Sequence, residues 1–305
     1  MKTKRLIKAV LILITITGIS FTGCKKDKGN YNTQSLQQLA NDETDIQTSS
    51  DDLLNDANDV LSAGQTKSLN ALPCGATMDS LIFNDTITYT LTFDGLNCNG
   101  RKYRTGQVKI MKNINDHWSH AGTTVRVEFI NLRVTRVLRN RSVTLNGNKY
   151  FTNVSGGLVR DLGNGVTSVI HRVTGNMQGT FDNNTTRTWT IARQRTFTGT
   201  PGQLILSIDG FGTINGYNNL ATWGLNRNGE EFYTQITQSV VHRQECGWDP
   251  VSGVKIHQVP SDNKRAVLTF GYDSNNQPVT GSNCPDRFRV DWEKNNHSGT
   301  LFLEL

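Results

Sequence analysis

The sequence predicts an all-β protein: an antiparallel meander of roughly a dozen or more strands, sandwich-like or barrel-like, after a short N-terminal helical stalk. Residues 86–93 alternate apolar side chains with threonines, and similar runs recur to the C-terminus. Five Asn-Gly pairs, a strong signal for hairpin turns, are spread along the chain. Beyond residue 66 no long window has the periodicity of a helix.

The strand-like runs can be placed individually. Residues 123–138 predict a long strand whose apolar face changes after Phe129, which indicates a β-bulge. Further strands are expected at 187–197, 230–241, 264–271, 286–293 and 299–305. The Asn-Gly pairs stand at 99–100, 146–147, 164–165, 215–216 and 228–229, and we expect turns at several of them.

Residues 34–62 have a partial apolar stripe at helical spacing and contain neither Pro nor Gly. The run Ser49-Ser50-Asp51-Asp52 predicts a break with an N-cap, and therefore two short helices. Seven acids and no Lys or Arg occur between residues 29 and 66. This composition favours a solvated acidic stalk over the alternative, a helix docked against a basic face of the following domain.

The N-terminus predicts export. The first eight residues include four cations, and residues 9–23 are uncharged, which is typical of a secretory signal and too short for a comfortable membrane span. The segment Ser20-Phe21-Thr22-Gly23-Cys24 resembles the lipobox of bacterial lipoproteins. That resemblance implies removal of residues 1–23 and acylation of Cys24, which would tether the protein to a membrane. The expected divisions are 1–23 signal peptide, 24–66 lipid anchor, tether and acidic stalk, and 67–305 β-rich domain.

The net charge of +6 includes the four cations of the signal segment. Without them the chain has 28 basic and 26 acidic side chains, a net charge of +2. Nucleic acid is therefore not an expected partner.

Four cysteines remain besides Cys24, and an even number in an exported chain indicates disulfides. Three pairings exist in principle. We favour Cys74–Cys98 and Cys246–Cys284, because each pair closes a local loop and brackets a similar motif. The cysteines lack the spacing of metal ligands, so no metal site is predicted there.

Those motifs form an internal repeat. Leu91-Thr92-Phe93 leads to Asn97-Cys98 and then Arg101, and Leu268-Thr269-Phe270 leads to Asn283-Cys284 and then Arg287. With the Cys24 lipobox and the acidic stalk, this pattern resembles uncharacterised outer-membrane lipoproteins of the Bacteroidetes. The resemblance implies attachment to the outer membrane, facing the periplasm or the outside. It also implies O-glycosylation at Ser80 and Thr86, which stand in Asp-Ser/Thr-aliphatic contexts. It supplies no catalytic residue and no cofactor.

The sequence has few features typical of a catalytic site. The chain contains no pattern typical of serine hydrolases, zinc proteases or nucleotide-binding loops. His117 and His120 form the one close histidine pair, which is poor evidence for a metal. Glu230 and Glu231 are adjacent, so a strand would point them to opposite faces. The tryptophans at 189, 223, 248 and 292 fit buried anchors better than a platform for sugar stacking. We therefore expect no enzyme, no metal and no cofactor.

One charged stretch points to a partner. Residues 125–198 hold ten Arg and one Lys against three acids, and five of the arginines fall in one strand-and-turn region: Arg126, Arg133, Arg136, Arg139 and Arg141. A solvated sheet face explains such a cluster, whereas a binding surface would take an anionic partner such as lipopolysaccharide head groups, an acidic glycan or the acidic stalk itself. The expected function is that of a non-enzymatic, lipid-anchored envelope protein that binds a glycan or another envelope ligand. The alternatives are a structural or assembly component that meets an envelope protein and, third, a hydrolase acting on glycans.

Overall fold

The computed structural model describes residues 34–63, 72–138 and 140–305. They form one long helix, three short 3-10 helices and a single sheet of fifteen strands. The helical elements are α1 (Gln34–Ala63), η2 (Val159–Asp161), η3 (Gln244–Cys246) and η4 (Pro260–Asp262). The strands are β1 (Ala76–Phe83), β2 (Thr86–Leu96), β3 (Lys102–Asn113), β4 (Thr124–Arg136), β5 (Arg141–Asn153), β6 (Val169–Phe181), β7 (Thr186–Thr198), β8 (Ile205–Gly210), β9 (Gly212–Ile214), β10 (Tyr217–Leu225), β11 (Glu231–Arg243), β12 (Pro250–Val259), β13 (Lys264–Tyr272), β14 (Arg287–Lys294) and β15 (His297–Glu304).

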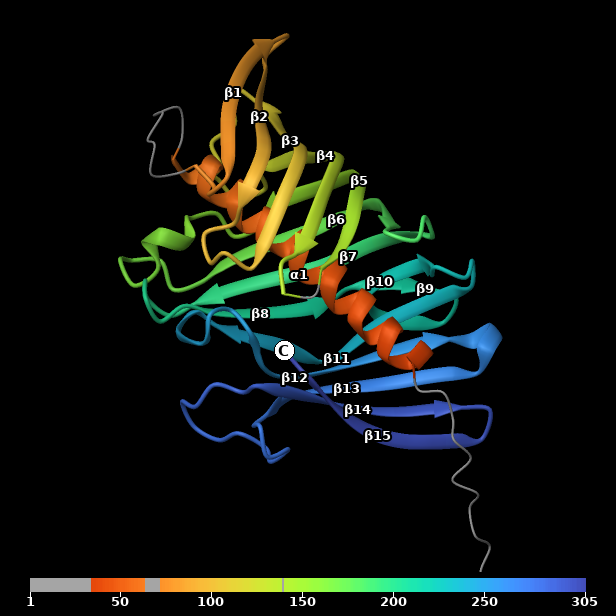
Figure 1. Cartoon of the computed structure of the whole chain (residues 1–305). Coiled ribbons are helices and arrows are strands. Elements are labelled where there is room, and N and C mark those ends of the chain that lie inside the picture. Colours follow the sequence, from red (N-terminus) through yellow and green to blue (C-terminus); the bar gives the residue numbers. More distant parts are fainter. Residues whose placement is uncertain (1–33, 64–71, 139) are drawn as a thin grey trace, which may run out of the picture.

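The sheet is an antiparallel meander, as predicted. Consecutive strands pair from β1 to β7 and from β10 to β15 (Figure 1). Strands β8 and β10 share the position between β7 and β11, because β10 pairs with residues 188–191 of β7 and β8 with residues 193–198. Strand β9 adds only to β10. Among the described residues β1 pairs only with β2 and β15 only with β14, so the sheet is one open, curved layer rather than two stacked sheets.

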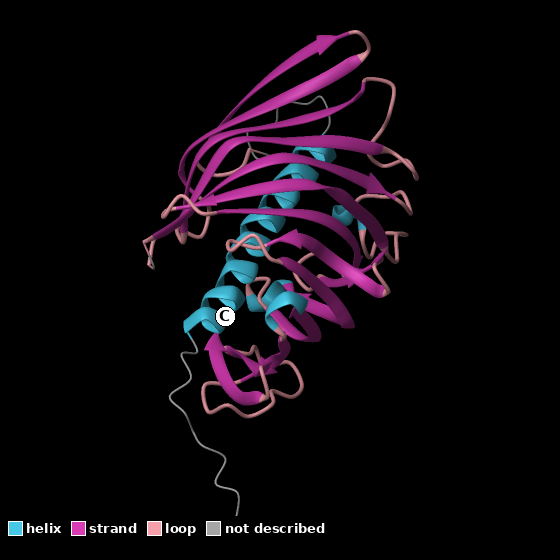
Figure 2. Cartoon of the chain, turned by 90° about the vertical axis from the view of Figure 1, so that its right-hand side faces the viewer, coloured by secondary structure: helices cyan, strands magenta, loops and turns pink. Residues whose placement is uncertain are grey.

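Helix α1 lies along the concave face of this sheet (Figure 2). Leu53, Leu54 and Ala57 of the helix are buried and share one apolar core with Phe93 and Phe129. The helix is therefore not the solvated stalk that its acidic composition favoured, and the docked alternative is correct. No helix in the described part of the chain has the length and apolar character needed to cross a membrane.

The helix also runs without interruption, which corrects the predicted break at residues 49–52. Ser49 and Ser50 are buried, and Lys149 Nζ of β5 donates a hydrogen bond to Ser50 Oγ. A serine hydroxyl that has a tertiary partner does not have to bond the local backbone, which is how serine otherwise starts or breaks a helix. Packing on the sheet thus overrides the local signal.

Strand β4 contains the predicted bulge. Its register with β5 shifts between Phe129 and Leu132, and Asn131 in between has a φ of 48°. Gly147 lies opposite Phe129 with a φ of 129°, and a Cβ there would stand 2.3 Å from the carbonyl oxygen of Asn176. The Asn-Gly pair at 146–147 is therefore inside β5, where close approach of a neighbouring strand requires glycine. The other four Asn-Gly pairs lie in connections between elements.

The two disulfides are those predicted. Cys74–Cys98 joins the segment before β1 to the β2–β3 loop, and Cys246–Cys284 joins η3 to the connection between β13 and β14. Disulfides persist in oxidising compartments, so they indicate a protein that works outside the cytoplasm. Each closes a loop of a length that stabilises a fold by roughly 3–4 kcal/mol.

Candidate anion-binding site

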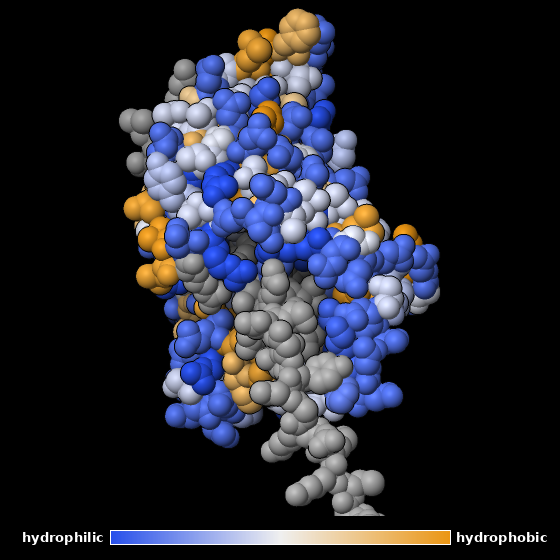
Figure 3. All heavy atoms as spheres, turned by 45° about the vertical axis from the view of Figure 1, so that its right-hand side comes forward, coloured by the Kyte–Doolittle hydropathy of each residue, from blue (hydrophilic) through white to orange (hydrophobic). Residues whose placement is uncertain are grey.

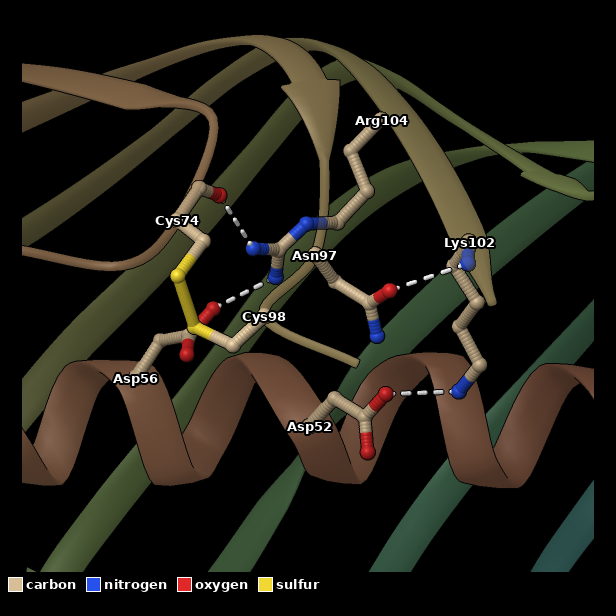
Figure 4. Close-up of polar contacts among 7 residues, drawn as sticks. All are labelled: Asp52, Asp56, Cys74, Asn97, Cys98, Lys102 and Arg104. Atoms are coloured by element: carbon tan, nitrogen blue, oxygen red, sulfur yellow. Dashed lines mark hydrogen bonds and ion pairs between the residues drawn. A yellow bond between two sulfur atoms is a disulfide. The ribbon is translucent and has the colours of Figure 1, made fainter. Parts of the chain in front are cut away.

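Cations of the sheet meet acids of α1 in the interior of the fold. Arg104 of β3 donates to Asp56 Oδ2 at 2.6 Å and to the carbonyl oxygen of Cys74 at 2.9 Å (Figure 4). Lys102 of the same strand donates to Asp52 Oδ2 at 2.6 Å. Arg104 is only 3% exposed, so its ion pair is shielded from water, and loss of either partner would leave an uncompensated charge.

Two more sheet residues and one residue of the β3–β4 connection donate to uncharged side chains of the helix. Besides Lys149 on Ser50, Arg195 Nη2 reaches Asn55 Oδ1 at 2.5 Å and Trp118 Nε1 reaches Asn58 Oδ1 at 3.1 Å. Two of these cations lie over aromatic rings of the core: Lys149 over Phe129 at 5.2 Å, and Arg195 over Phe197 at 5.1 Å. Their long stems thus pack on apolar surface while their charged ends bind the helix.

Near its N-terminal end, α1 presents Asp42 to two arginines. Asp42 accepts a hydrogen bond from Arg227 in the β10–β11 turn, and its Oδ1 lies 3.6 Å from Nη2 of Arg141. Burial raises the pKa of Asp42 to about 6, against the lowering effect of Arg227, Arg187 and Arg141. Burial likewise raises the pKa of Asp56 to about 6, opposed chiefly by Arg104. Both carboxyls are thus ionised at neutral pH at a free-energy cost that the arginines only partly offset.

A cavity of about 200 Å³ adjoins this pair of arginines. It lies where α1 meets the turns β4–β5, β6–β7 and β10–β11. Three of its lining side chains are arginines, and four others are polar: Arg136, Arg141, Arg227, Ser49, Ser142, Asp182 and Asn183. The arginine fork matches the geometry of carboxylate, sulfate and phosphate groups.

The charge of Asp182 is already compensated. Its carboxylate accepts hydrogen bonds at 2.7 Å from Arg133 Nη2 and from the backbone N–H of Ser142. Although burial alone would raise the pKa of Asp182, these partners hold it below its ordinary value. The carboxylate is therefore committed to Arg133 and Ser142, and the other charged side chains among the described residues that line the cavity are arginines.

The structure brings together only part of the predicted arginine surface. Arg136 and Arg141 line the cavity. Arg133 does not line it but donates a hydrogen bond to Asp182, which does. Arg126 lies towards the opposite end of β4, where it bonds Asn148 at 2.9 Å and Glu128 at 3.4 Å. Arg139 lies outside the described residues.

Sequence reasoning missed Arg227 and Asp42. Arg227 precedes the Asn-Gly pair at 228–229, so its place in a turn was readable from the sequence. Its partner was not, because Asp42 and Arg227 are 185 residues apart. No periodicity or motif connects positions at that separation.

The predicted modification sites have mixed outcomes. Cys24 lies outside the described residues, so its acylation stays a prediction. Ser80 is exposed on β1 and Thr86 is half-buried at the start of β2, so both lie on the first hairpin. Their glycosylation also stays a prediction.

The residues considered for catalysis do not converge. The rings of His117 and His120 are 5.0 Å apart, and no cluster of three or more ligand-type side chains exists in the described part of the chain. Glu230 bonds Asn226 in the β10–β11 turn, whereas Glu231 accepts from the Tyr233 hydroxyl. The four tryptophans lie on separate elements: buried Trp189 and Trp292, and half-buried Trp223 and Trp248.

Comparison with known proteins places the chain near none of them. No family model, curated protein or solved structure matches it.

Proposed function

We propose that this protein is a lipid-anchored component of the outer membrane that binds an acidic glycan in the cavity between α1 and the β4–β5, β6–β7 and β10–β11 turns. The observation that carries the proposal is the set of three arginines around that cavity. The N-terminal signal, Cys24 and the acidic helix of the sequence support the envelope setting. Two disulfides agree with a site outside the cytoplasm.

The size of the cavity limits the ligand. Sites for drug-sized molecules commonly have volumes of roughly 300–1,000 Å³, so about 200 Å³ suits one charged sugar residue better than a buried oligosaccharide. We propose that a single uronic acid or sulfated sugar enters, and that the rest of the glycan stays in solvent. Ser142 and Asn183 would then supply hydrogen bonds to its hydroxyl groups.

Binding suits the lining better than hydrolysis does. Hydrolysis of a glycosidic bond ordinarily needs two carboxyl groups, one of them able to donate a proton. Among the described residues that line the cavity, Asp182 alone carries a carboxyl, and it is engaged by Arg133 and Ser142. We therefore propose a binding protein without enzymatic activity.

Isothermal titration of the full chain in a mild detergent tests the proposal, with a galacturonic acid trimer as probe and maltotriose as neutral control. We expect the acidic trimer alone to bind, and its affinity to fall as salt is added. Arg141→Gln removes a half-exposed cavity arginine and should weaken binding by about 10-fold or more, the usual effect of a lost charged hydrogen bond.

Arg126→Gln is the matched control, because Arg126 lies on the same β4–β5 hairpin but outside the cavity. It should leave binding unchanged. Equal binding of the two sugars, or equal loss in both variants, would remove the cavity from consideration.

A further inference from the structure

The β1–β2 hairpin projects beyond the rest of the sheet, and apolar side chains gather at its end (Figures 1 and 3). Leu81, Ile82 and Phe83 are 67%, 55% and 70% exposed. Because neighbouring residues of a strand point to opposite faces, both faces of the hairpin end are apolar. Single exposed apolar residues are ordinary, whereas a contiguous group on a projecting element indicates an interaction surface.

These side chains belong to a strand with an open edge. Strand β1 pairs with β2 from Ala76 to Phe83 without a register shift, and among the described residues its other edge has no strand. It contains no Lys, no Pro and no bulge, which are the usual protections of an edge strand, and its one charge is Asp79. Among the described residues no strand pairs with its outer backbone groups, which a further strand could use.

A lipid surface fits this hairpin poorly. The apex is formed by Asn84 and Asp85, both with left-handed φ and both exposed. Insertion would carry the Asp85 carboxylate into hydrocarbon before the apolar residues, which is strongly unfavourable. The apolar group also lies on the edge strand alone, since Ile87 on β2 is buried. This placement suits the addition of a strand at β1.

We infer that the occupant of this edge is β1 of a second copy, paired antiparallel about a two-fold axis. Such an axis sets one residue of the strand opposite its own copy. A register centred on Leu81 sets Leu81 against Leu81, Phe83 against Asp79 and Ile82 against Ser80 of the second copy. A register centred on Asp79 would oppose two like charges, and one centred on Ser80 would set each Leu81 against Asp79 of the other copy. One centred on Ile82 would run most of each strand past the apex of the other hairpin.

The other free edge of the sheet does not offer the same partner. On β15, Leu301 and Leu303 are half-buried and pack against the core formed by the second half of the sheet. Pairing of β1 with β15 would also join unlike edges, which generates an open series rather than a closed dimer. The exposed apolar residues of β1 thus favour the closed, two-fold arrangement.

Oxidative crosslinking in membranes of expressing cells tests the register. Leu81→Cys should form a disulfide-linked dimer under a mild oxidant, because residues opposite each other in an antiparallel pair have Cβ atoms about 5 Å apart. Leu138→Cys is the matched control, since Leu138 is 93% exposed in the β4–β5 turn and far from the proposed interface in the sequence of strands. Absence of the dimer with Leu81→Cys, or an equal yield with Leu138→Cys, would overturn the inference.

Light scattering of the detergent-solubilised full chain gives a second measurement. We expect twice the monomer mass for the unaltered chain and for Leu138→Lys, and the monomer mass for Leu81→Lys, which places a charge at the centre of the interface. A monomer at every concentration, or a series of larger assemblies, contradicts a β1–β1 dimer. The result does not depend on the arginine-lined cavity, and Leu81→Lys should bind the galacturonic acid trimer as the unaltered chain does.

Discussion

Replacement of Asp56 by Asn should change how the stability of the protein depends on pH. Asp56 is largely buried against Arg104, and burial raises its pKa from 3.8 to about 6. The folded protein therefore binds the proton of this carboxyl more tightly than the unfolded chain does. Its contribution to stability is fully present below pH 3.8 and is lost as the pH rises through about 6. An asparagine amide does not titrate in this range, so the Asp56→Asn variant would lack this dependence.

The magnitude follows from the size of the shift. A rise from 3.8 to about 6 corresponds to about 3 kcal/mol, at about 1.36 kcal/mol for each pKa unit. The side chain of Asp56 is 21% exposed to solvent, and the resulting screening reduces the expected contribution to about 2 kcal/mol. As the pH rises from 4 to 7.5, we expect the difference in unfolding free energy between Asp56→Asn and the unaltered chain to shift by about 2 kcal/mol in favour of the variant, whatever the constant cost of leaving Arg104 without its carboxylate.

Urea unfolding at several pH values, followed by tryptophan fluorescence, measures this difference. Trp118 is a suitable reporter because its indole donates to Asn58 of α1. Other acids, including Asp182 with its lowered pKa, destabilise the fold as the pH falls, and the difference between the two proteins cancels them. Asp116→Asn, an exchange in an exposed turn, is the control. A difference between Asp56→Asn and the unaltered chain that stays constant with pH would refute the reasoning.

Three further predictions concern stability and are all measured by urea unfolding at pH 7.5. The Gly147→Ala variant should lose more than about 2 kcal/mol of unfolding free energy, because the added Cβ would meet a backbone oxygen. Gly165→Ala adds a Cβ in open space at a residue with positive φ, so it should lose only about 1 kcal/mol. Equal losses in the two variants would contradict this reasoning. Joint replacement of Cys246 and Cys284 by Ser should lose about 3–4 kcal/mol, and an unchanged midpoint would speak against a stabilising disulfide. Arg104→Met should lose about 3–5 kcal/mol of unfolding free energy in the unaltered chain, because it leaves the Asp56 carboxylate without its partner. The same exchange should cost clearly less in a chain that already carries Asp56→Asn, and an equal cost in both backgrounds would show that the two residues do not interact.

The sheet was predictable because its signal is local. Half-buried strands alternate apolar and polar residues, as in residues 86–93, and four of the connections contain an Asn-Gly pair. The bulge in β4 could be predicted for the same reason, since an extra residue exchanges the two faces after Phe129. The curvature that forms one open layer around a helix was not predictable, because it arises from the accumulated twist of many strands.

The environment of α1 was not predictable from its own residues. Seven acids without a basic residue suggest a solvated helix when the segment is considered alone. The counter-ions of Asp52, Asp56 and Asp42 come from distant parts of the chain: Lys102 and Arg104 on β3, and Arg227 after β10. The break expected at Ser49 and Ser50 failed for the same reason, since the partner of Ser50 is Lys149 on β5.

The charges at the helix also explain how the cavity can keep its positive character. The acidic segment was one of the anionic partners predicted for the basic stretch at 125–198. In the structure the two segments form an ion pair between Asp42 and Arg141. Asp42 is a single carboxylate shared by two cavity arginines. One carboxylate cannot neutralise two guanidinium groups, so among the described side chains at the cavity positive charge stays in excess with the helix docked. An anionic ligand therefore does not have to displace α1 to find a favourable potential.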